Sequence, residues 1–316
     1  MGVNITVDED VAALSKEIKE LRKRRDAVIL AHNYQRPEVM DVADYIGDSL
    51  GLSRQAAATD AKVIVFCGVD FMAETASILN PGKTVLHPEA VRSCCPMAMM
   101  LTEDQVVEAR KAHPSAEFVL YINSHAKVKT YADWICTSGN VLDVVKQTKS
   151  KTVLFGPDKN MAYYIQKRVP EKQIITVPSF GLCPTHHLIT GQDVEAARKA
   201  YPNALLVVHP ECRPEVQDAA DAIASTEGIV GFCKKSAHKE FIIGTENGTL
   251  YRLGKEMPGK KFYPLSQKTY CPTMKSITLT KVRDSLINMR PAVSVPDEIR
   301  EKALIPLKRM MALPKP

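Results

Sequence analysis

Three Cys-Pro dipeptides divide this chain of 316 residues at equal intervals. Their cysteines are Cys95, Cys183 and Cys271, so each lies 88 residues from the next. A fixed period of this length indicates three copies of one structural unit, and such a repeat constrains the fold more than any single motif does. If the copies pack around a common centre, three thiols converge there, and converging thiolates are typical of a metal or metal-cluster site.

Other blocks of sequence recur in the same register. The segment that begins at His32 (HNYQRPEVMDVADYIGDS) resembles the one that begins at His209 (HPECRPEVQDAADAIAST), and a weaker copy begins at Tyr121. The blocks VIVFCGVD, TVLFGPD and FIIGTE each contain a glycine, and these glycines are again 88 residues apart: Gly68, Gly156 and Gly244. Chance similarity does not keep separate blocks in register, so we interpret the chain as a threefold internal repeat.

Each copy has the pattern of alternating strands and helices. In the first copy the short runs AVILA, VIVF and TVL lack the alternation of half-exposed strands, which indicates strands buried on both faces. Segments such as SRQAAATDA and GNVLDVVKQT have helical spacing and few helix breakers. We therefore expect strand, helix, strand, helix, strand in each copy, with parallel strands and right-handed crossovers.

The predicted fold class is α/β, with three pseudo-symmetric three-layer αβα domains that have small parallel sheets and surround a central active site. The predicted domains cover residues 27–113, 114–202 and 203–280. Residues 1–26 form an N-terminal helical extension, because DVAALSKEIKELRKRRD has the spacing of an amphipathic helix. Residues 281–316 form a C-terminal extension.

Composition is that of an ordinary globular protein. Hydrophobic residues make up 45% of the chain and charged residues 25%. No apolar run approaches the roughly 20 residues of a membrane helix, and no signal peptide is recognisable, so we expect a cytoplasmic protein. MGVNIT matches a myristoylation pattern at Gly2, but nothing else points to a membrane. The net charge of +6 is dispersed, which suits small anionic substrates better than nucleic acid.

The eight cysteines separate into two groups. Five have no counterpart in the other copies, and for these we predict small buried hydrophobic residues: Cys67, Cys94, Cys136, Cys212 and Cys233. Cys94 adjoins Cys95, but the position before proline selects Cys95 as the repeated residue. Without a secretory signal, reduced thiols are expected rather than a disulfide framework.

The three repeated cysteines predict a ligand set with one open position. Structural zinc sites and ferredoxin-type clusters use four protein ligands, often in CxxC pairs, and no CxxC occurs here. A [4Fe-4S] cluster on three thiolates leaves one iron free to act as a Lewis acid. A Cys₃His zinc site could instead be completed by His186, three residues after Cys183. Spacing alone leaves iron and zinc open.

Hydroxyl residues precede a helical segment in each copy. They are Ser49, Ser138 and the pair Ser225 and Thr226. A hydroxyl in this position typically caps a helix N-terminus. Three helix N-termini around one cleft would present free N–H groups and positive dipole ends, so we expect them to bind carboxylate or phosphate groups of the substrates.

A pair of polar residues ends the equivalent strand in each copy. The pairs are His32 and Tyr34, Tyr121 and Asn123, and His209 and Glu211. Ligands of parallel sheets bind at the carboxyl ends of the strands, so these side chains are expected to face the central cleft. Histidine and glutamate suit proton transfer, whereas tyrosine and asparagine suit donation to a carbonyl or oxyanion.

With these residues identified, the chain resembles the quinolinate synthases, the NadA family. The motifs recur in order over nearly the whole chain: LAHNYQRPEVMDVADYIGDS, GVDFMAE, CPMA, YINS, ICTSGN, FGPDKN, CPTHH, VHPEC, IGTENG and the final Cys271. The resemblance implies an oxygen-sensitive [4Fe-4S] cluster held by three Cys ligands, Cys95, Cys183 and Cys271, with one open iron. It also implies the condensation of iminoaspartate with dihydroxyacetone phosphate to quinolinate, phosphate and water in NAD biosynthesis.

The resemblance further implies a set of active-site residues. These are His32, Tyr34, Ser49, Tyr121, Asn123, Ser138, His186, His209, Glu211 and Thr226. We expect Tyr34 and Glu211 to transfer protons and His186 and Asn123 to orient oxygens. His186 and Tyr121 are counted with the catalytic residues. Ser225 joins Thr226 as a predicted substrate-binding residue. The doubled Cys94-Cys95 departs from the family pattern of a single cysteine before proline, and leaves Cys94 as an alternative ligand.

The expected partners are small-molecule substrates, with functional coupling to an aspartate-oxidising enzyme and no role for nucleic acid or membrane. Two alternatives stay open at this point. One is another cluster-dependent hydro-lyase that uses the same open iron. The other is a zinc-bound binding or redox-sensing protein that catalyses no reaction.

Overall fold

Three parallel four-stranded sheets form the framework of this computed structural model, which describes residues 10–313. The first sheet has the order β2-β1-β3-β4, the second β6-β5-β7-β8 and the third β10-β9-β11-β12. The strands are β1 (Ala27–His32), β2 (Tyr45–Gly47), β3 (Val63–Cys67), β4 (Thr84–Leu86), β5 (Glu117–Tyr121), β6 (Trp134–Cys136), β7 (Thr152–Gly156), β8 (Gln173–Thr176), β9 (Leu205–Val208), β10 (Ala222–Ile223), β11 (Glu240–Gly244) and β12 (Lys261–Pro264). The same order in each sheet confirms three pseudo-symmetric α/β units.

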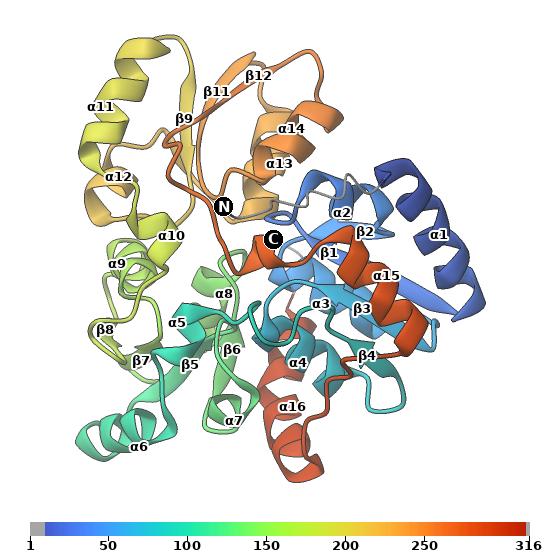
Figure 1. Ribbon diagram of the computed structural model, residues 1–316. Helices are drawn as coiled ribbons and strands as arrows, with labels where there is room; N and C mark the ends of the chain where they lie inside the picture. Colours follow the sequence, from blue (N-terminus) through green and yellow to red (C-terminus); the bar gives the residue numbers. More distant parts are fainter. Residues whose placement is uncertain (1–9, 314–316) are drawn as a thin grey trace, which may run out of the picture.

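Helices flank each sheet, and the three units surround a common centre (Figure 1). The first unit contains α2 (Pro37–Val42), α3 (Ser49–Ala58), α4 (Asp70–Leu79), α5 (Pro96–Met99) and α6 (Glu103–Ala112). The second contains α7 (Ala126–Lys129), α8 (Val141–Gln147), α9 (Lys159–Arg168), α10 (Pro184–His187) and α11 (Gly191–Ala200). The third contains α12 (Pro214–Asp218), α13 (Thr226–Lys235), α14 (Thr249–Glu256) and the 3-10 helix η1 (Met274–Ser276).

Each unit has one strand more than the sequence predicts. The additional strands are β2, β6 and β10, which are only two or three residues long. Each pairs with a single neighbour at the edge of its sheet, and most of their residues are partly exposed. Segments this short and this exposed lack a continuous apolar run, so the prediction of three strands per copy is wrong at this point.

Close packing explains why glycine recurs at the end of the central strands β3, β7 and β11. A Cβ atom at Gly244 would lie 2.7 Å from the Val208 side chain, and one at Gly156 would overlap the carbonyl oxygen of Val177. A Cβ atom at Gly68 would lie 2.9 Å from the Phe66 ring. The backbone approaches a neighbouring strand or side chain too closely for any larger residue, so the aligned glycines mark equivalent positions of the three units.

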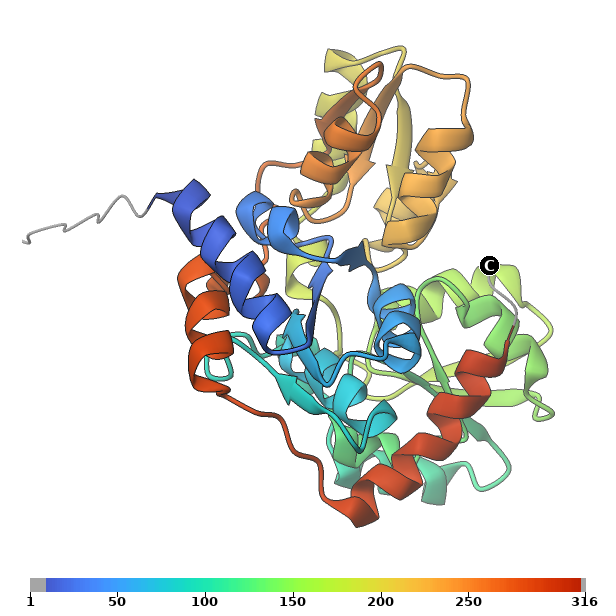
Figure 2. The same cartoon turned by 90° about the vertical axis from the view of Figure 1, so that its right-hand side faces the viewer.

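Three further helices lie outside the repeat. The predicted N-terminal helix is α1 (Val11–Arg24), and it packs beside α15 (Leu279–Asn288) against the first unit (Figure 2). The last helix, α16 (Asp297–Ala312), packs on β6, α7 and α4 and so joins the first two units (Figure 2). The pattern at Gly2 lies outside the described residues. Within residues 10–313, no helix has the length and apolar character needed to cross a membrane.

The first two units share a hydrophobic core, whereas the third has its own. Phe66 of the first unit, Phe118 of the second and Leu307 of α16 belong to a single buried cluster. The third unit packs Ile242 and Phe241 into two separate clusters on either side of its sheet. Met274 of the third unit belongs to the cluster shared by the first two units, so the three units meet at this cluster.

Candidate active site

A cavity of about 140 Å³ lies where the three units meet. Twelve of the predicted site residues line it: His32, Tyr34, Ser49, Cys95, Tyr121, Asn123, Ser138, Cys183, His209, Glu211, Thr226 and Cys271. They come from strand ends, Cys-Pro turns and helix starts of all three units. The threefold repeat therefore brings together residues that are far apart in the sequence.

Two predicted residues lie behind the cavity wall. His186 is only 1% exposed and touches the cavity residues Cys183 and Glu211 rather than the cavity itself. Ser225 is the N-cap of α13, where its hydroxyl accepts the Gly228 N–H at 3.1 Å. His186 therefore contacts residues that line the cavity, and Ser225 holds the start of the helix that begins with Thr226.

The N-cap predictions hold for only one of the three helices. Asp48, not Ser49, caps α3 by accepting the Gly51 N–H at 2.9 Å. Asn140, not Ser138, is the residue at the start of α8. The aligned hydroxyls occupy similar places in sequence, but the chain enters the helix one or two residues away from them. Ser49 and Ser138 line the cavity without acting as caps.

The three repeated cysteines occupy equivalent turns. Cys95 and Cys183 begin α5 and α10, and their backbone angles agree within one degree. Pro96 and Pro184 suit the first position of α5 and α10, because a helix's first residue needs no N–H donor and its φ angle suits the ring. The Cys271 carbonyl accepts the Lys275 N–H at 3.1 Å, as the Cys95 carbonyl accepts that of Met99 at 3.3 Å.

An acidic residue that the sequence analysis missed holds each cysteine backbone. The N–H groups of Cys95, Cys183 and Cys271 donate to the carboxylates of Asp70 at 3.0 Å, Asp158 at 2.9 Å and Glu246 at 3.1 Å. The sequence does carry a signal for them. Each acid stands two residues after an aligned glycine, so the three are also 88 residues apart.

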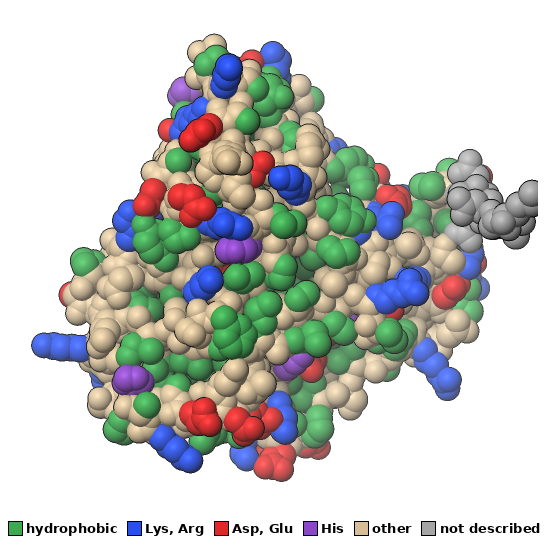
Figure 3. Space-filling view, turned by 60° about the vertical axis from the view of Figure 1, so that its left-hand side comes forward, with side chains coloured by type: hydrophobic (Ala, Val, Ile, Leu, Met, Phe, Trp, Pro, Cys, Tyr) green, Lys and Arg blue, Asp and Glu red, His purple; other side chains and the backbone are tan. Residues whose placement is uncertain are grey.

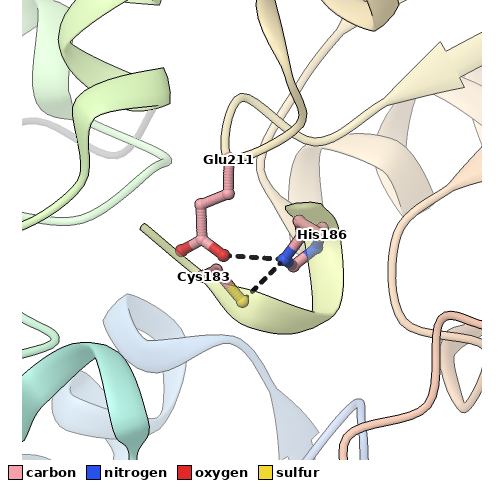
Figure 4. A group of neighbouring side chains, drawn as sticks. All are labelled: Cys183, His186 and Glu211. Carbon is pink, nitrogen blue, oxygen red and sulfur yellow. Dashed lines mark hydrogen bonds and ion pairs between the residues drawn. The ribbon is translucent and has the colours of Figure 1, made fainter. Parts of the chain in front are cut away.

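Glu211 is the centre of a buried hydrogen-bond network. Its Oε1 accepts the Tyr121 hydroxyl at 2.6 Å, and its Oε2 lies 2.8 Å from Nδ1 of His186 (Figure 4). Burial alone would raise the pKa of Glu211, but His209 and His186 bring it down to about 2. The carboxylate is therefore ionised.

The network extends to Tyr34 through a residue that the sequence did not single out. Thr245 Oγ1 lies 2.8 Å from the Tyr34 hydroxyl and 2.9 Å from Nε2 of His186. Thr226 provides a second partner for Tyr34 at 2.9 Å. Burial, reinforced by Glu211, raises the pKa of Tyr34 well above its usual value, so the phenol stays protonated.

Comparisons with known proteins agree with this geometry. Residues 16–312 match the family described as "Quinolinate synthetase A protein". The chain is 51% identical to a quinolinate synthase of Methanoregula boonei, over 96% of this chain and 100% of that protein. It is also 51% identical to one of Pyrococcus furiosus, over 96% and 99%, and 50% identical to one of Thermodesulfovibrio yellowstonii, over 94% and 97%.

The chain belongs to the quinolinate synthetase A family. For this family member the remaining question is which cofactor its thiols fit. Burial, with smaller effects of nearby acidic groups, raises the pKa of the Cys95 thiol, and burial with Glu211 raises that of Cys183. Such thiols become thiolates when a cation compensates their charge. The donor set of this chain therefore fits a metal group.

A single ion requires its ligand atoms to lie close together. Among the described residues, the group whose ligand atoms lie within 4.8 Å of one another is Cys183, His186 and Glu211, and Cys95 and Cys271 are not part of it. A zinc ion with bonds of about 2.3 Å would need its sulfurs roughly 4 Å apart. The group that meets this spacing contains one of the three repeated thiols, that of Cys183.

The other cysteines have the predicted surroundings in most cases. Cys67, Cys136, Cys212 and Cys233 are buried, which confirms them as small core residues. Cys94 is only partly buried and does not line the cavity. Its Sγ lies 3.4 Å from the Val91 carbonyl oxygen, so Cys95 is the better-placed ligand.

Proposed function

We propose that this protein is a quinolinate synthase, an enzyme of NAD biosynthesis that condenses iminoaspartate with dihydroxyacetone phosphate. Family membership supports this activity. The observation that carries it is a single cavity lined by three repeated thiols and by acid-base residues from all three units. Carbon-carbon and carbon-nitrogen bond formation followed by dehydration needs proton transfer at several positions, and the cavity offers suitable groups.

Cys95, Cys183 and Cys271 are the proposed ligands of a [4Fe-4S] cluster. When bound through three cysteines, such a cluster offers an open iron that acts as a Lewis acid toward a hydroxyl or carboxylate oxygen. The three thiols come from equivalent turns of the three units and line the cavity. The rest of the cavity is then available to the substrate. Cys94 lies outside this set.

Glu211 and Tyr34 are the proposed proton-transfer residues. Both residues line the cavity, so a substrate bound there can reach the Glu211 carboxylate as a proton acceptor and the Tyr34 hydroxyl as a proton donor. Thr245 and His186 connect the two through hydrogen bonds. A proton taken up at one end can therefore be replaced at the other. Tyr121 donates to Glu211 and keeps its carboxylate oriented.

The remaining lining residues are the proposed substrate-binding groups. His32, Ser49, Asn123, Ser138, His209 and Thr226 offer hydrogen bonds to two carboxylates and a phosphate. Asn123 is notable because its Oδ1 is buried and has no hydrogen-bond partner among the described residues. A substrate N–H or O–H would satisfy that oxygen. Ser225 contributes indirectly by capping the helix that begins with Thr226.

The cell context follows from this chemistry. We propose a cytoplasmic enzyme coupled functionally to an aspartate-oxidising enzyme, because the imine substrate hydrolyses in water and must be used soon after it forms. On the face drawn in Figure 3, basic and acidic side chains are interspersed.

The proposed domains cover residues 27–113, 114–202 and 203–280, between the extensions 1–26 and 281–316.

Product analysis tests the proposed activity. Anaerobic protein is supplied with dihydroxyacetone phosphate and with iminoaspartate generated by oxidation of aspartate, and quinolinate is measured by liquid chromatography. We expect quinolinate and phosphate to form in equal amounts. A cluster-loaded protein that forms no quinolinate but dehydrates another hydroxy acid would instead identify a different hydro-lyase.

A further inference from the structure

The acids that hold the cysteine backbones form a threefold set, and we call Asp70, Asp158 and Glu246 the carboxylate ring. We propose that the carboxylate ring positions the three cofactor ligands and thereby keeps the cluster in place. This inference rests on the proposed cluster and extends it beyond the cysteines. The acids touch the ligand backbones rather than the substrate cavity, so they are positioning residues.

Two members of the ring join the cysteine turn to the start of a helix with separate oxygens. In Asp158, Oδ2 accepts the Cys183 N–H at 2.9 Å and Oδ1 accepts the Met161 N–H at 2.7 Å. In Glu246, Oε1 accepts the Cys271 N–H at 3.1 Å and Oε2 accepts a second N–H, that of Gly248, at 2.7 Å. Each carboxylate therefore fixes the cysteine relative to the rigid part of its unit.

Asp70 makes the same link with a single oxygen. Its Oδ1 accepts both the Cys95 N–H at 3.0 Å and the Phe71 N–H at 2.8 Å. Its other oxygen, Oδ2, lies 3.1 Å from Nε2 of His125. Asp70 thus accepts both N–H groups with one oxygen, whereas Asp158 uses two. The two residues are therefore expected to respond differently to replacement by asparagine.

Because two of its members are buried, removal of a carboxylate from the ring is expected to destabilise the cysteine turn that it holds. Asp158 and Glu246 are fully buried, and loss of either carboxylate would leave a cysteine N–H without an acceptor. The turn would then be free to move its thiol. Groups that orient metal ligands through hydrogen bonds typically change metal affinity about tenfold to a hundredfold when they are removed.

The experiment compares alanine and amide variants after anaerobic reconstitution. Iron and sulfide are counted, iron release to a chelator is timed, and the reduced cluster is recorded by electron paramagnetic resonance. Asp158→Ala and Asp70→Ala are expected to release iron about tenfold to a hundredfold faster than the unmodified protein, with altered spectra. Asp70→Asn is expected to behave nearly as the unmodified protein, since one amide oxygen can serve both N–H groups. Asp158→Asn is expected to be intermediate, because it keeps one acceptor of two.

Asp193→Ala is the matched control. Asp193 also holds the start of a helix, α11, but its partner is Thr190 and not a cysteine. It is expected to lose stability without faster iron release. Circular dichroism of every variant checks folding, and the amide variants remain informative if an alanine variant does not fold.

Three results would overturn the inference. The first is an iron-release rate and a spectrum in Asp158→Ala and Asp70→Ala that equal those of the unmodified protein. The second is iron release that is equally fast in Asp70→Asn and Asp70→Ala. The third is iron release in Asp193→Ala that is as fast as in the ring variants. A different failure, no cluster in the unmodified protein after reconstitution, would instead contradict the proposed cofactor. The two failures are therefore distinguishable.

Discussion

At the scale of single residues, the site is organised around one ionised carboxylate and one protonated phenol. Glu211 and Tyr34 belong to different units, and His186 and Thr245 connect them by hydrogen bonds of 2.8 to 2.9 Å. A buried network of this kind is sensitive to the loss of any member, because each polar group there depends on its protein partners instead of water. Small changes to its members are therefore expected to affect turnover more than folding.

Replacement of Tyr34 tests the proposed proton donor. Tyr34→Phe removes the hydroxyl that contacts Thr226 and Thr245 but keeps the ring that packs on His32. We expect kcat to fall about 10²- to 10⁴-fold, the range typical of a lost acid-base group. Steady-state quinolinate formation measures this, with iron content as a control for cluster loading. Full turnover in a loaded variant would remove Tyr34 from the proton-transfer residues.

Two buried histidines predict a loss of stability in mild acid. Burial, with the positive charge of Lys275, lowers the pKa of His32 to about 3, and burial lowers the pKa of His209 to about 3. An unfolded histidine titrates near 6.5, so between about pH 6.5 and 3 the unfolded chain binds more protons. Stability is therefore present above pH 6.5 and decreases as the pH falls through this window.

Urea unfolding of the cluster-free protein at several pH values between 7 and 4 measures this loss. In His209→Gln one titrating group is absent, so the free energy of unfolding should depend less steeply on pH than in the unmodified chain. An unchanged slope in this variant would show that His209 is not held neutral by burial.

Twelve of the residues predicted from the sequence line the cavity, and the omissions from the candidate site have physical causes. Pairs at strand ends, such as Tyr121 with Asn123, could be found because parallel sheets direct such residues to one edge. Thr245 could not, because a threonine after a strand is common and its role depends on contacts across units. Asp158 could have been found from its 88-residue spacing, but a single acid near a helix start has an ordinary explanation as a cap.

At the scale of helices and strands, close backbone contacts limit what the sequence can vary. Gly156 ends β7 where a Cβ would overlap the Val177 carbonyl, whereas Gly231 in α13 has open space around it. The edge strand β6, in contrast, leaves no recognisable signal in the sequence. Its three residues carry no pattern that a single-sequence argument could recognise, and only pairing with β5 makes it a strand.

A pair of glycine variants tests this contrast. Gly156→Ala is expected to destabilise the protein by about 1–3 kcal/mol or more through overpacking. Gly231→Ala is expected to stabilise it by roughly 0.5–1 kcal/mol, because alanine favours a helix interior. Chemical unfolding of both variants measures the free energies. Similar values for the two positions would contradict the close approach at Gly156.

At the scale of the whole molecule, polar contacts attach the third unit to the first. Lys275 follows the last cysteine, and its Nζ lies 3.0 Å from the Glu246 carboxylate while it also donates to the carbonyl oxygens of Tyr34 and Gln35. At the outer edge of the same interface, Lys255 pairs with Asp41 in an exposed position. One buried and one exposed lysine thus bridge the same two units.

Substitution of the two lysines separates their contributions. Lys275→Met leaves the Glu246 carboxylate buried without its cation, which is expected to cost about 3–5 kcal/mol of stability. Lys255→Met removes a surface pair and is expected to cost about 0–1 kcal/mol. Both are measured by chemical unfolding of the cluster-free protein. Equal effects would mean that the buried pair does not hold the two units together.

In the proposed function the threefold repeat brings three thiols to one cluster. The most direct measurement is the iron and acid-labile sulfide content of protein purified without oxygen, compared with Cys94→Ser and Cys95→Ser variants. The account predicts a brown protein with about four iron and four sulfide per chain, retained in Cys94→Ser and lost in Cys95→Ser. A colourless, zinc-loaded protein, or a cluster that depends on Cys94 instead of Cys95, would contradict it.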